Sequence, residues 1–115
     1  MHKNKVTHRD LKPQNILLCD KTGDLTIKIA DFGFSCIYDP KDGLDVTLGS
    51  PMYMAPELIN KKVYNEKVDI WAMVVICYML LSGEPPFPAE TKAEMNDMIS
   101  HKTPVYSSKA FKKVS

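Results

Sequence analysis

The longest apolar stretch of the chain runs from Ile70 to Leu81 and holds twelve residues without a charge. A helix that spans a bilayer needs about 20 such residues, so this stretch is too short to cross a membrane. An apolar run with no polar stripe predicts a helix that is buried on every side. Asp69 precedes the run as a candidate N-cap, and Ser82-Gly83 followed by Pro85-Pro86 marks its end.

A second pattern, closer to the N-terminus, predicts a β-hairpin. The short apolar run 16–18 indicates a strand, and the residues at 20–24 are typical of a turn. Apolar residues at positions 25, 27 and 29 then alternate with polar ones, as in a return strand. Because the strands run out and back, Asn15 and Asp31 are expected at the same end of the hairpin.

The pattern of polar and apolar residues also predicts a long loop and a short helix. Residues 34–50 are largely polar and are predicted to form a long loop without secondary structure, which in a compact domain is usually functional or disordered. Near the C-terminus, Thr91 and Glu94 have the spacing of a capping box. They predict a short helix whose apolar face contains Met95, Met98 and Ile99, with the methionines serving as core packing.

The composition is that of an ordinary globular domain. Of 115 residues, 44% are hydrophobic and 25% are charged, and the net charge of +1 provides no basic field for nucleic acid or an anionic membrane. The cysteines are odd in number, widely spaced and free of any CxxC pattern, which argues against a disulfide framework or a zinc site. With no signal peptide at its start, the chain is expected in the reducing cytoplasm.

The candidate chemistry lies between residues 8 and 33. Asp10 can accept a hydroxyl proton or orient the hydroxyl for attack, and Lys12 is a point charge suited to a phosphate oxygen. Asn15 offers a neutral oxygen and Asp31 an anionic one, and such a pair suits a Mg²⁺ ion that keeps several waters. These are the parts that phosphoryl transfer requires, because its catalysis consists mostly of positioning and charge neutralisation.

These motifs resemble those of a known family. The ordered set H-R-D-L-x-x-x-N, D-F-G and A-P-E is the signature of eukaryotic protein kinases, and here it stands at His8 to Asn15, Asp31 to Gly33 and Ala55 to Glu57. Residues 49–57 are also similar to the equivalent segment of unc-51-like and calcium-dependent kinases. The resemblance implies an α+β fold, a protein-kinase-like C-lobe fragment that is mainly helical with a short β-hairpin at the catalytic loop.

By this resemblance, residues 1–115 form a partial protein kinase domain, from the catalytic loop to the helix after the central buried helix. Residues 1–7 resemble the end of the helix that leads into the catalytic loop. The Gly-rich loop and strand lysine of the N-terminal lobe, and the last helices of the C-terminal lobe, are expected to be absent. An isolated fragment of this kind is expected to be inactive.

The resemblance also implies ATP and Mg²⁺ as cofactors and assigns the residues that handle them. The catalytic residues would be Asp10, Lys12, Asn15 and Asp31, of which Asn15 and Asp31 hold the metal. The ATP-binding residues would be Lys12, Gln14, Asn15, Leu17 and Asp31. Leu17 would form the floor of the adenine pocket, although an ordinary core leucine is an equally open interpretation.

Other roles implied by the resemblance are regulatory and structural. Arg9 would pair with a phosphate on the loop 34–50, for which Thr47 is the leading site and Ser35 a weaker one; an unmodified loop hydroxyl remains an open alternative for Thr47. Ser50 would bond Asp10 and Lys12 and position the substrate. The pairing of Lys12 with Ser50 favours serine or threonine as the acceptor.

Two carboxylates are assigned structural roles. Asp69 would bond the backbone of the catalytic loop. Glu57 would be buried and paired with an arginine from later in a kinase lobe, whereas Arg9 is the one arginine of this sequence. Because an unpaired buried carboxylate costs about 3–5 kcal/mol, an isolated fragment is expected to be unstable.

Three functional hypotheses follow. The first is a protein serine/threonine kinase that transfers the γ-phosphoryl group of Mg-ATP to a protein. The second is a non-catalytic kinase remnant or pseudokinase that serves as an interaction module. The third is a small-molecule phosphotransferase, against which the loop 34–50 and Ala55-Pro56-Glu57 speak. The kinase subfamily, the substrate and the oligomeric state are left open by the sequence.

Overall fold

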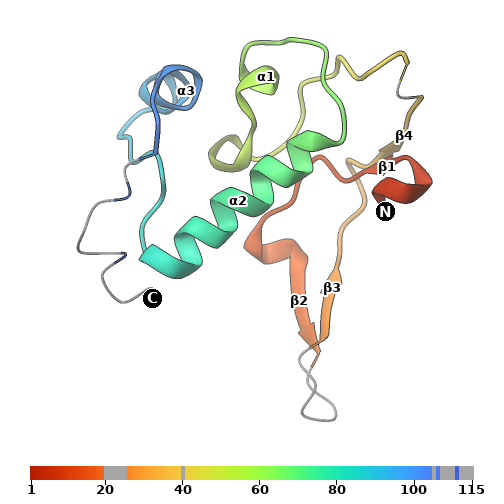
Figure 1. Cartoon of the computed structure of the whole chain (residues 1–115), viewed down its shortest axis with the longest axis horizontal. Helices are drawn as coiled ribbons and strands as arrows, with labels where there is room; N and C mark the ends of the chain where they lie inside the picture. The colour runs from red at the N-terminus through yellow and green to blue at the C-terminus, as the bar shows by residue number, and fades with distance from the viewer. Residues whose placement is uncertain (20–25, 40, 105, 107–110, 112–115) are drawn as a thin grey trace.

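The computed structural model describes residues 1–19, 26–39, 41–104, 106 and 111 (Figure 1). Among these, three α-helices, three short 3₁₀ helices and four short strands follow one another along the chain. The elements, in order, are η1 (His2–Asn4), β1 (Val6–Thr7), η2 (Pro13–Asn15), β2 (Ile16–Cys19), β3 (Thr26–Ile29), β4 (Cys36–Ile37), η3 (Pro51–Tyr53), α1 (Pro56–Ile59), α2 (Lys67–Ser82) and α3 (Lys92–His101).

The predicted hairpin is present as β2 and β3, which pair antiparallel with Ile16 opposite Ile29. The backbone N–H of Ala30 then donates to the carbonyl of Asn15 at 2.8 Å, so the pairing extends one step past the strands. Asn15 and Asp31 therefore lie at the same end of the hairpin, as the sequence predicted. The turn predicted at 20–24 and the strand position at 25 lie outside the described residues.

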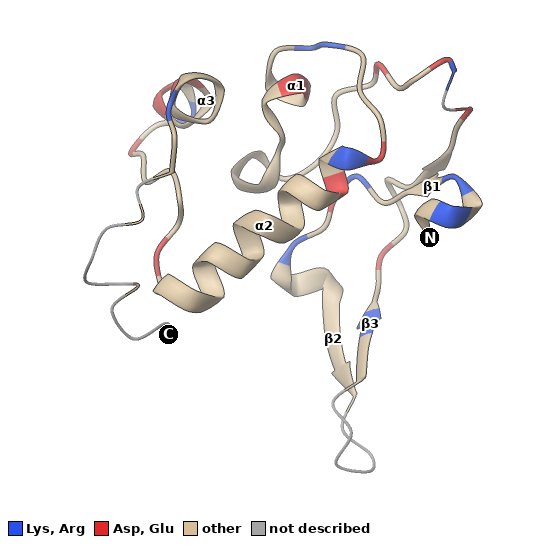
Figure 2. Ribbon diagram, in the orientation of Figure 1, with Lys and Arg blue, Asp and Glu red and all other residues tan. Residues whose placement is uncertain are grey.

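Helix α2 crosses the centre of the molecule, and beyond its first turn its ribbon carries no Lys, Arg, Asp or Glu (Figure 2). Val68, Ala72, Val75 and Ile76 are buried, but Met73, Val74 and Leu80 are between half and four-fifths exposed. The prediction of a helix buried on every side is therefore wrong for this chain. The described elements cover one side of α2, and its other side faces solvent.

The boundaries of α2 correct a second prediction. The helix begins at Lys67 with Glu66 as the N-cap residue, so Asp69 lies in the first turn and is not the cap. It ends where predicted, at Gly83, whose φ of 75° is the left-handed conformation that glycine adopts without a steric penalty. The start differs because the Asp69 carboxylate is used elsewhere, as described below.

The loop predicted at 34–50 has more structure than expected. Strand β4 lies within it and pairs antiparallel with β1, with Thr7 opposite Cys36. Leu44 forms an isolated antiparallel bridge with Tyr64. The N-terminal segment also differs from the predicted helix end, because it consists of one 3₁₀ turn, η1, followed by β1.

The core lies between α1, the start of α2 and the segment before it. Its buried members are Ala55, Leu58, Tyr64 and Val68, with Leu44, Met54 and Trp71 packed against them. Helix α3 contacts α1 and η3. Its cap is as predicted, since Thr91 Oγ1 accepts a hydrogen bond from the Glu94 N–H, and Ile99 is its buried residue. In the described part of the chain, no helix combines the length and apolar character that crossing a membrane requires.

Candidate active site

Asp69 fixes the catalytic loop to α2. Its Oδ2 accepts a hydrogen bond from the backbone N–H of His8 and its Oδ1 one from the backbone N–H of Arg9, both at 2.9 Å. The side chain is almost fully buried, with 1% of its surface exposed. A carboxylate that accepts two amide hydrogen bonds holds the backbone at two adjacent points, and the expected structural role of Asp69 matches this geometry.

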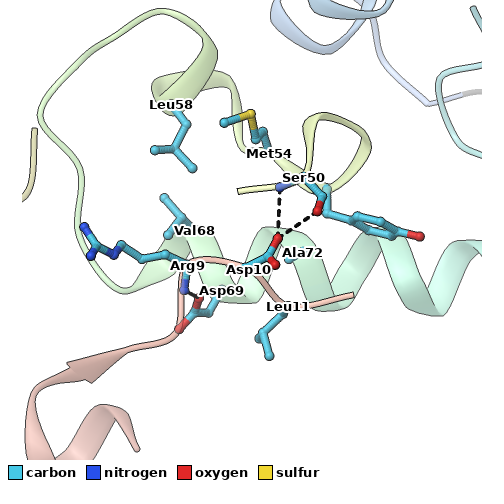
Figure 3. Close-up of a pocket in the computed structure, with 10 residues that line it drawn as sticks. Arg9, Asp10, Leu11, Ser50, Met54, Leu58, Val68, Asp69 and Ala72 are labelled. Carbon is cyan, nitrogen blue, oxygen red and sulfur yellow. Dashed lines mark hydrogen bonds between the residues drawn. The ribbon is translucent and has the colours of Figure 1, made fainter. Parts of the chain in front are cut away.

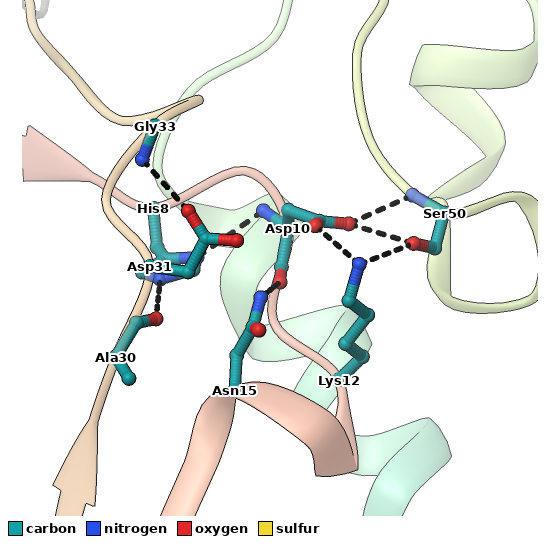
Figure 4. A network of polar contacts seen from close by, with 8 residues as sticks. All are labelled: His8, Asp10, Lys12, Asn15, Ala30, Asp31, Gly33 and Ser50. Atoms are coloured by element: carbon teal, nitrogen blue, oxygen red, sulfur yellow. Dashed lines mark hydrogen bonds and ion pairs between the residues drawn. The ribbon is translucent and has the colours of Figure 1, made fainter.

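Asp10 lies at the centre of a closed polar network (Figures 3 and 4). Ser50 donates to Asp10 Oδ1 twice, from its backbone N–H at 3.0 Å and from its hydroxyl at 2.8 Å. The Lys12 ammonium donates to Asp10 Oδ2 at 2.7 Å and to the Ser50 hydroxyl at 3.2 Å. Three residues that the sequence assigned to one site are thus in direct contact.

The network lowers the pKa of Asp10. Burial by itself would raise the pKa of this carboxyl, but hydrogen bonds from Lys12 and Ser50 and the positive charge of Lys12 together lower the pKa below its usual 3.8. Asp10 is therefore an anion at neutral pH. A carboxylate with a lowered pKa is a weak base, so the geometry favours orientation of a hydroxyl over early removal of its proton.

Asn15 and His8 hold the loop around Asp10 (Figure 4). The Asn15 side-chain amide donates to the Asp10 carbonyl at 2.9 Å. His8 is fully buried; its Nδ1 lies 3.3 Å from the Asp10 backbone N–H and its Nε2 lies 3.1 Å from the Ala30 carbonyl. Both contacts are satisfied by the tautomer with the proton on Nε2. His8 is therefore a buried residue that holds the loop in place.

Asp31 stands on the strand-end turn opposite Asn15. Its φ of 59° is in the left-handed region, and its Oδ1 accepts from the Gly33 N–H at 3.2 Å. The neighbouring Phe32 ring packs edge-on against His8, with ring centroids 5.1 Å apart. This contact joins the turn at 31–33 to the catalytic loop.

The donor set fits a hard divalent cation. The Asn15 amide nitrogen is used by Asp10, which leaves its oxygen without a hydrogen-bond donor among the described residues. Asp31 is exposed, and only one of its oxygens accepts a hydrogen bond from that part of the chain. An amide oxygen and a carboxylate with open lone pairs suit Mg²⁺, which is commonly held by few protein oxygens and several waters. Within the described ranges, no group of three or more His, Cys, Asp or Glu side chains gathers at a possible metal site.

The residues expected at the nucleotide include Gln14 and Leu17, and both are exposed. Gln14 is exposed in η2, next to Asn15. Leu17 is 49% exposed on β2. This exposure argues against the alternative of an ordinary core leucine and leaves the side chain accessible to a ligand.

The predicted regulatory pair is not in direct contact. Arg9 donates from Nε to the Phe34 carbonyl at 2.6 Å and from Nη1 to the Tyr64 hydroxyl at 3.4 Å. Thr47 is exposed, and no hydrogen bond joins it to another described residue. The weaker candidate, Ser35, donates to the Phe32 carbonyl at 2.6 Å. The phosphorylation of Thr47 remains a prediction.

Glu57 differs from its expected environment. Its side chain is only half-buried and forms no ion pair with the described residues. Because the carboxylate retains access to water, the cost of leaving it unpaired is smaller than the sequence argument assumed.

Three long-range contacts in the fold around the site were missed by sequence reasoning. The His2 ring reaches Asp69 Oδ2 at 2.7 Å. The Tyr38 hydroxyl accepts from the Glu66 backbone N–H at 3.2 Å, and the Tyr64 hydroxyl donates to the Val46 carbonyl at 2.6 Å. Each contact joins segments at least 18 residues apart. No local pattern signals such a contact, because the two partners lie far apart in the sequence.

Comparison with known proteins supplies the class to which this geometry belongs. The protein kinase domain family matches residues 1–114. The chain therefore belongs to the protein kinase family, and the resemblance drawn from its motifs is confirmed. The predicted α+β, kinase-like fragment is confirmed with it.

Two relatives show which kinds of kinase the chain is similar to. The chain is 48% identical over 98 residues to calcium-dependent protein kinase 7 of Oryza sativa subsp. japonica, covering 85% of this chain and 18% of that protein. It is 46% identical over 101 residues to human myosin light chain kinase 2, skeletal/cardiac muscle, covering 87% and 17%. Similarity to calcium-dependent kinases is thus confirmed. The chain spans less than a fifth of the length of these relatives.

Proposed function

We propose that the protein carrying this domain is a serine/threonine protein kinase that transfers the γ-phosphoryl group of Mg-ATP to a protein hydroxyl. The observation that carries the proposal is the closed network of Asp10, Lys12 and Ser50. It holds a carboxylate, an ammonium and a hydroxyl within hydrogen-bond distance, next to the oxygens of Asn15 and Asp31. The family membership supports the same activity.

The lone pairs of Asp10 indicate where the acceptor hydroxyl binds. Oδ1 already accepts two hydrogen bonds from Ser50, whereas Oδ2 accepts one from Lys12. A carboxylate oxygen has two acceptor positions. The remaining position on Oδ2 is therefore the one that orients a substrate hydroxyl, beside the Lys12 ammonium.

The other residues stabilise charge. When bound, Mg-ATP supplies the phosphoryl group and the metal that neutralises its oxygens. Asn15 and Asp31 would hold the metal, and Lys12 would face the phosphoryl oxygens from the side of Asp10. Gln14 and Leu17 would contact the nucleotide. We place this activity in the cytoplasm, with a protein bearing serine or threonine as the substrate.

The test is phosphoryl transfer from labelled ATP to a mixture of serine, threonine and tyrosine peptides by the full-length protein. We expect serine or threonine transfer that falls at least 100-fold in Asp31→Ala and in Asp10→Asn, as expected when a metal ligand or positioned acid–base group is lost. Asp45→Asn, an exposed loop carboxylate, is the matched control and should retain full activity.

Three results would contradict the proposed function or its site assignment. Unchanged transfer in Asp31→Ala would refute the metal assignment. No transfer to any peptide by the wild type would favour the non-catalytic interaction module, and transfer to a sugar or antibiotic in place of peptides would favour the small-molecule phosphotransferase.

A further inference from the structure

The Tyr64 hydroxyl connects two parts of the chain that are far apart in sequence. It donates to the Val46 carbonyl at 2.6 Å and accepts from Arg9 Nη1 at 3.4 Å. A phenol has a single proton, so its donation to Val46 leaves only lone pairs for Arg9. The two contacts are therefore compatible and are made by the same oxygen.

The Tyr64 side chain is held rigidly. Only 5% of its surface is exposed, and it belongs to the core cluster with Ala55, Leu58 and Val68. Its backbone forms the bridge to Leu44, with both N–H to carbonyl distances at 2.8 Å. A buried ring with a bridged backbone presents its hydroxyl in a fixed position.

Tyr64 and Asp10 hold the two ends of one loop segment. Leu44 and Val46 are bonded to Tyr64, and Ser50 is bonded to Asp10. The exposed Thr47 lies between these attachment points. The position of Ser50 on Asp10 therefore depends on where the segment 44–46 is anchored.

The second contact of Tyr64 is with the residue next to Asp10. Arg9 has a φ of 68° and its backbone N–H is bonded to Asp69. Its guanidinium extends away from the Asp10 carboxylate (Figure 3), towards Phe34 and Tyr64. Tyr64 therefore touches Arg9 and the loop segment, but none of the residues proposed to contact ATP, metal or acceptor.

We propose that Tyr64 is a positioning residue of the kinase reaction, whose hydroxyl couples the segment 44–50 to Arg9 and so holds Ser50 on Asp10. The proposal rests on the proposed kinase function. It deepens that function by identifying a residue that regulates the site through the loop.

The test variant is Tyr64→Phe, which removes the hydroxyl and keeps the buried ring. Tyr38→Phe is the matched control. Tyr38 is 8% exposed, and its hydroxyl accepts from the Glu66 backbone N–H just before α2, but within the described ranges no hydrogen bond joins that hydroxyl to Arg9 or to the segment 44–50. Both variants remove a phenolic hydroxyl from a buried tyrosine, but only Tyr64→Phe removes hydrogen bonds to Val46 and Arg9.

Three quantities are measured in the full-length protein: hydrogen exchange of the Ser50 amide, which donates to Asp10 Oδ1, kcat with a serine peptide, and the KM for ATP. We expect Tyr64→Phe to speed this exchange about tenfold and to lower kcat about tenfold. A tenfold change is what the loss of one buried hydrogen bond produces. The KM for ATP should stay within twofold, because Tyr64 does not contact the nucleotide residues. Tyr38→Phe should change neither exchange of the Ser50 amide nor kcat by more than twofold.

Three outcomes would overturn the proposal: exchange in Tyr64→Phe within twofold of wild type, faster exchange with unchanged kcat, or an equal effect of Tyr38→Phe. A wild-type protein that transfers no phosphate would refute the proposed kinase function and, with it, the positioning role. The exchange measurement would then still decide whether the Tyr64 hydroxyl anchors the segment.

Discussion

Asp69, in the first turn of α2, accepts a hydrogen bond at 2.9 Å from the backbone N–H of Arg9, a residue 60 positions earlier in the chain. The same carboxylate accepts a second bond from the His8 N–H. The central helix thereby fixes the backbone conformation that precedes Asp10. The backbone geometry around Asp10 therefore depends on a buried side chain that lies outside the network of Asp10, Lys12 and Ser50.

The first prediction concerns this carboxylate. Asp69→Asn keeps the size of the side chain but turns an NH₂ group towards one of the two backbone N–H donors. We expect the free energy of unfolding to fall by about 3 kcal/mol, because a buried hydrogen bond to a charged group is lost and a donor is left unsatisfied. Chemical denaturation measures the change.

The control for Asp69 is Asp97→Asn. Asp97 lies on α3, is 63% exposed and pairs with His101 at 3.0 Å. Exposed pairs of this kind contribute little, so the free energy of unfolding should change by no more than about 0.5 kcal/mol. A similar loss in both variants would contradict the anchoring role of Asp69.

The second prediction compares two glycines. Gly49 has a φ of 120°, and a Cβ at this position would lie 2.7 Å from the Arg9 carbonyl oxygen. Gly83 has a φ of 75° with open space around the same position. Gly49→Ala should cost about 3 kcal/mol or more, since it combines backbone strain with a clash against backbone. Gly83→Ala should cost only about 1 kcal/mol.

The two glycine variants should also differ in phosphoryl transfer. Displacement of residue 49 moves Ser50 away from Asp10, so the kcat of Gly49→Ala should fall while that of Gly83→Ala stays near wild type. Equal kcat values in the two variants would show that the loop tolerates a side chain at 49.

The third prediction is a pH dependence. Because the folded pKa of Asp10 lies below its unfolded value, the folded state binds this proton less tightly. The resulting stabilisation is complete above the unfolded pKa of about 3.9 and is lost as the pH falls through the folded pKa. Lys12→Met removes a hydrogen bond and a positive charge that lower the pKa of Asp10. The free energy of unfolding of this variant should therefore fall less steeply on acidification than that of the wild type.

The measurement is the free energy of unfolding between pH 6 and about pH 3, in steps. Lys28→Met, on the exposed strand β3, serves as the control and should keep the wild-type slope. An unchanged slope in Lys12→Met would mean that Lys12 does not set the charge state of Asp10.

The fourth prediction is a stabilising substitution. The Thr7 hydroxyl is fully buried and has no hydrogen-bond partner in the described part of the chain. Thr7→Val replaces this hydroxyl by a methyl group of the same shape, so the free energy of unfolding should rise by about 1 kcal/mol. Thr26→Val, at an exposed strand position, should change it by less than about 0.5 kcal/mol. A loss of stability in Thr7→Val would reveal an unseen partner for the hydroxyl.

Local features of the fold followed from the sequence. The hairpin β2–β3 brought Asn15 and Asp31 to one end because antiparallel pairing fixes the register once the turn is placed. The cap at Thr91 and the end of α2 at Gly83 also followed, since both depend on residues within one turn of each other. The catalytic motif 8–15 is equally local.

The tertiary structure decided which contacts form between segments that are far apart in the sequence. The sequence favoured Asp69 as a helix cap, but its carboxylate is bonded to the backbone of the catalytic loop and the cap lies three residues earlier, at Glu66. The burial of α2 was overestimated because periodicity shows which residues are apolar and not which neighbours cover them. The anchoring of the loop by Tyr64 had no sequence signal.

The sequence by itself determined that the chain belongs to the protein kinase family and that one hairpin brings Asn15 and Asp31 to the same end, because these depend on motifs and short spacings. The three-dimensional fold decided how Asp10 is held by Ser50, how Arg9 is held by Tyr64 and how His8 is held by Asp69. Each of these contacts joins residues at least 40 positions apart. Hydrogen bonds across such separations exist only after the core has packed, and no local propensity encodes them.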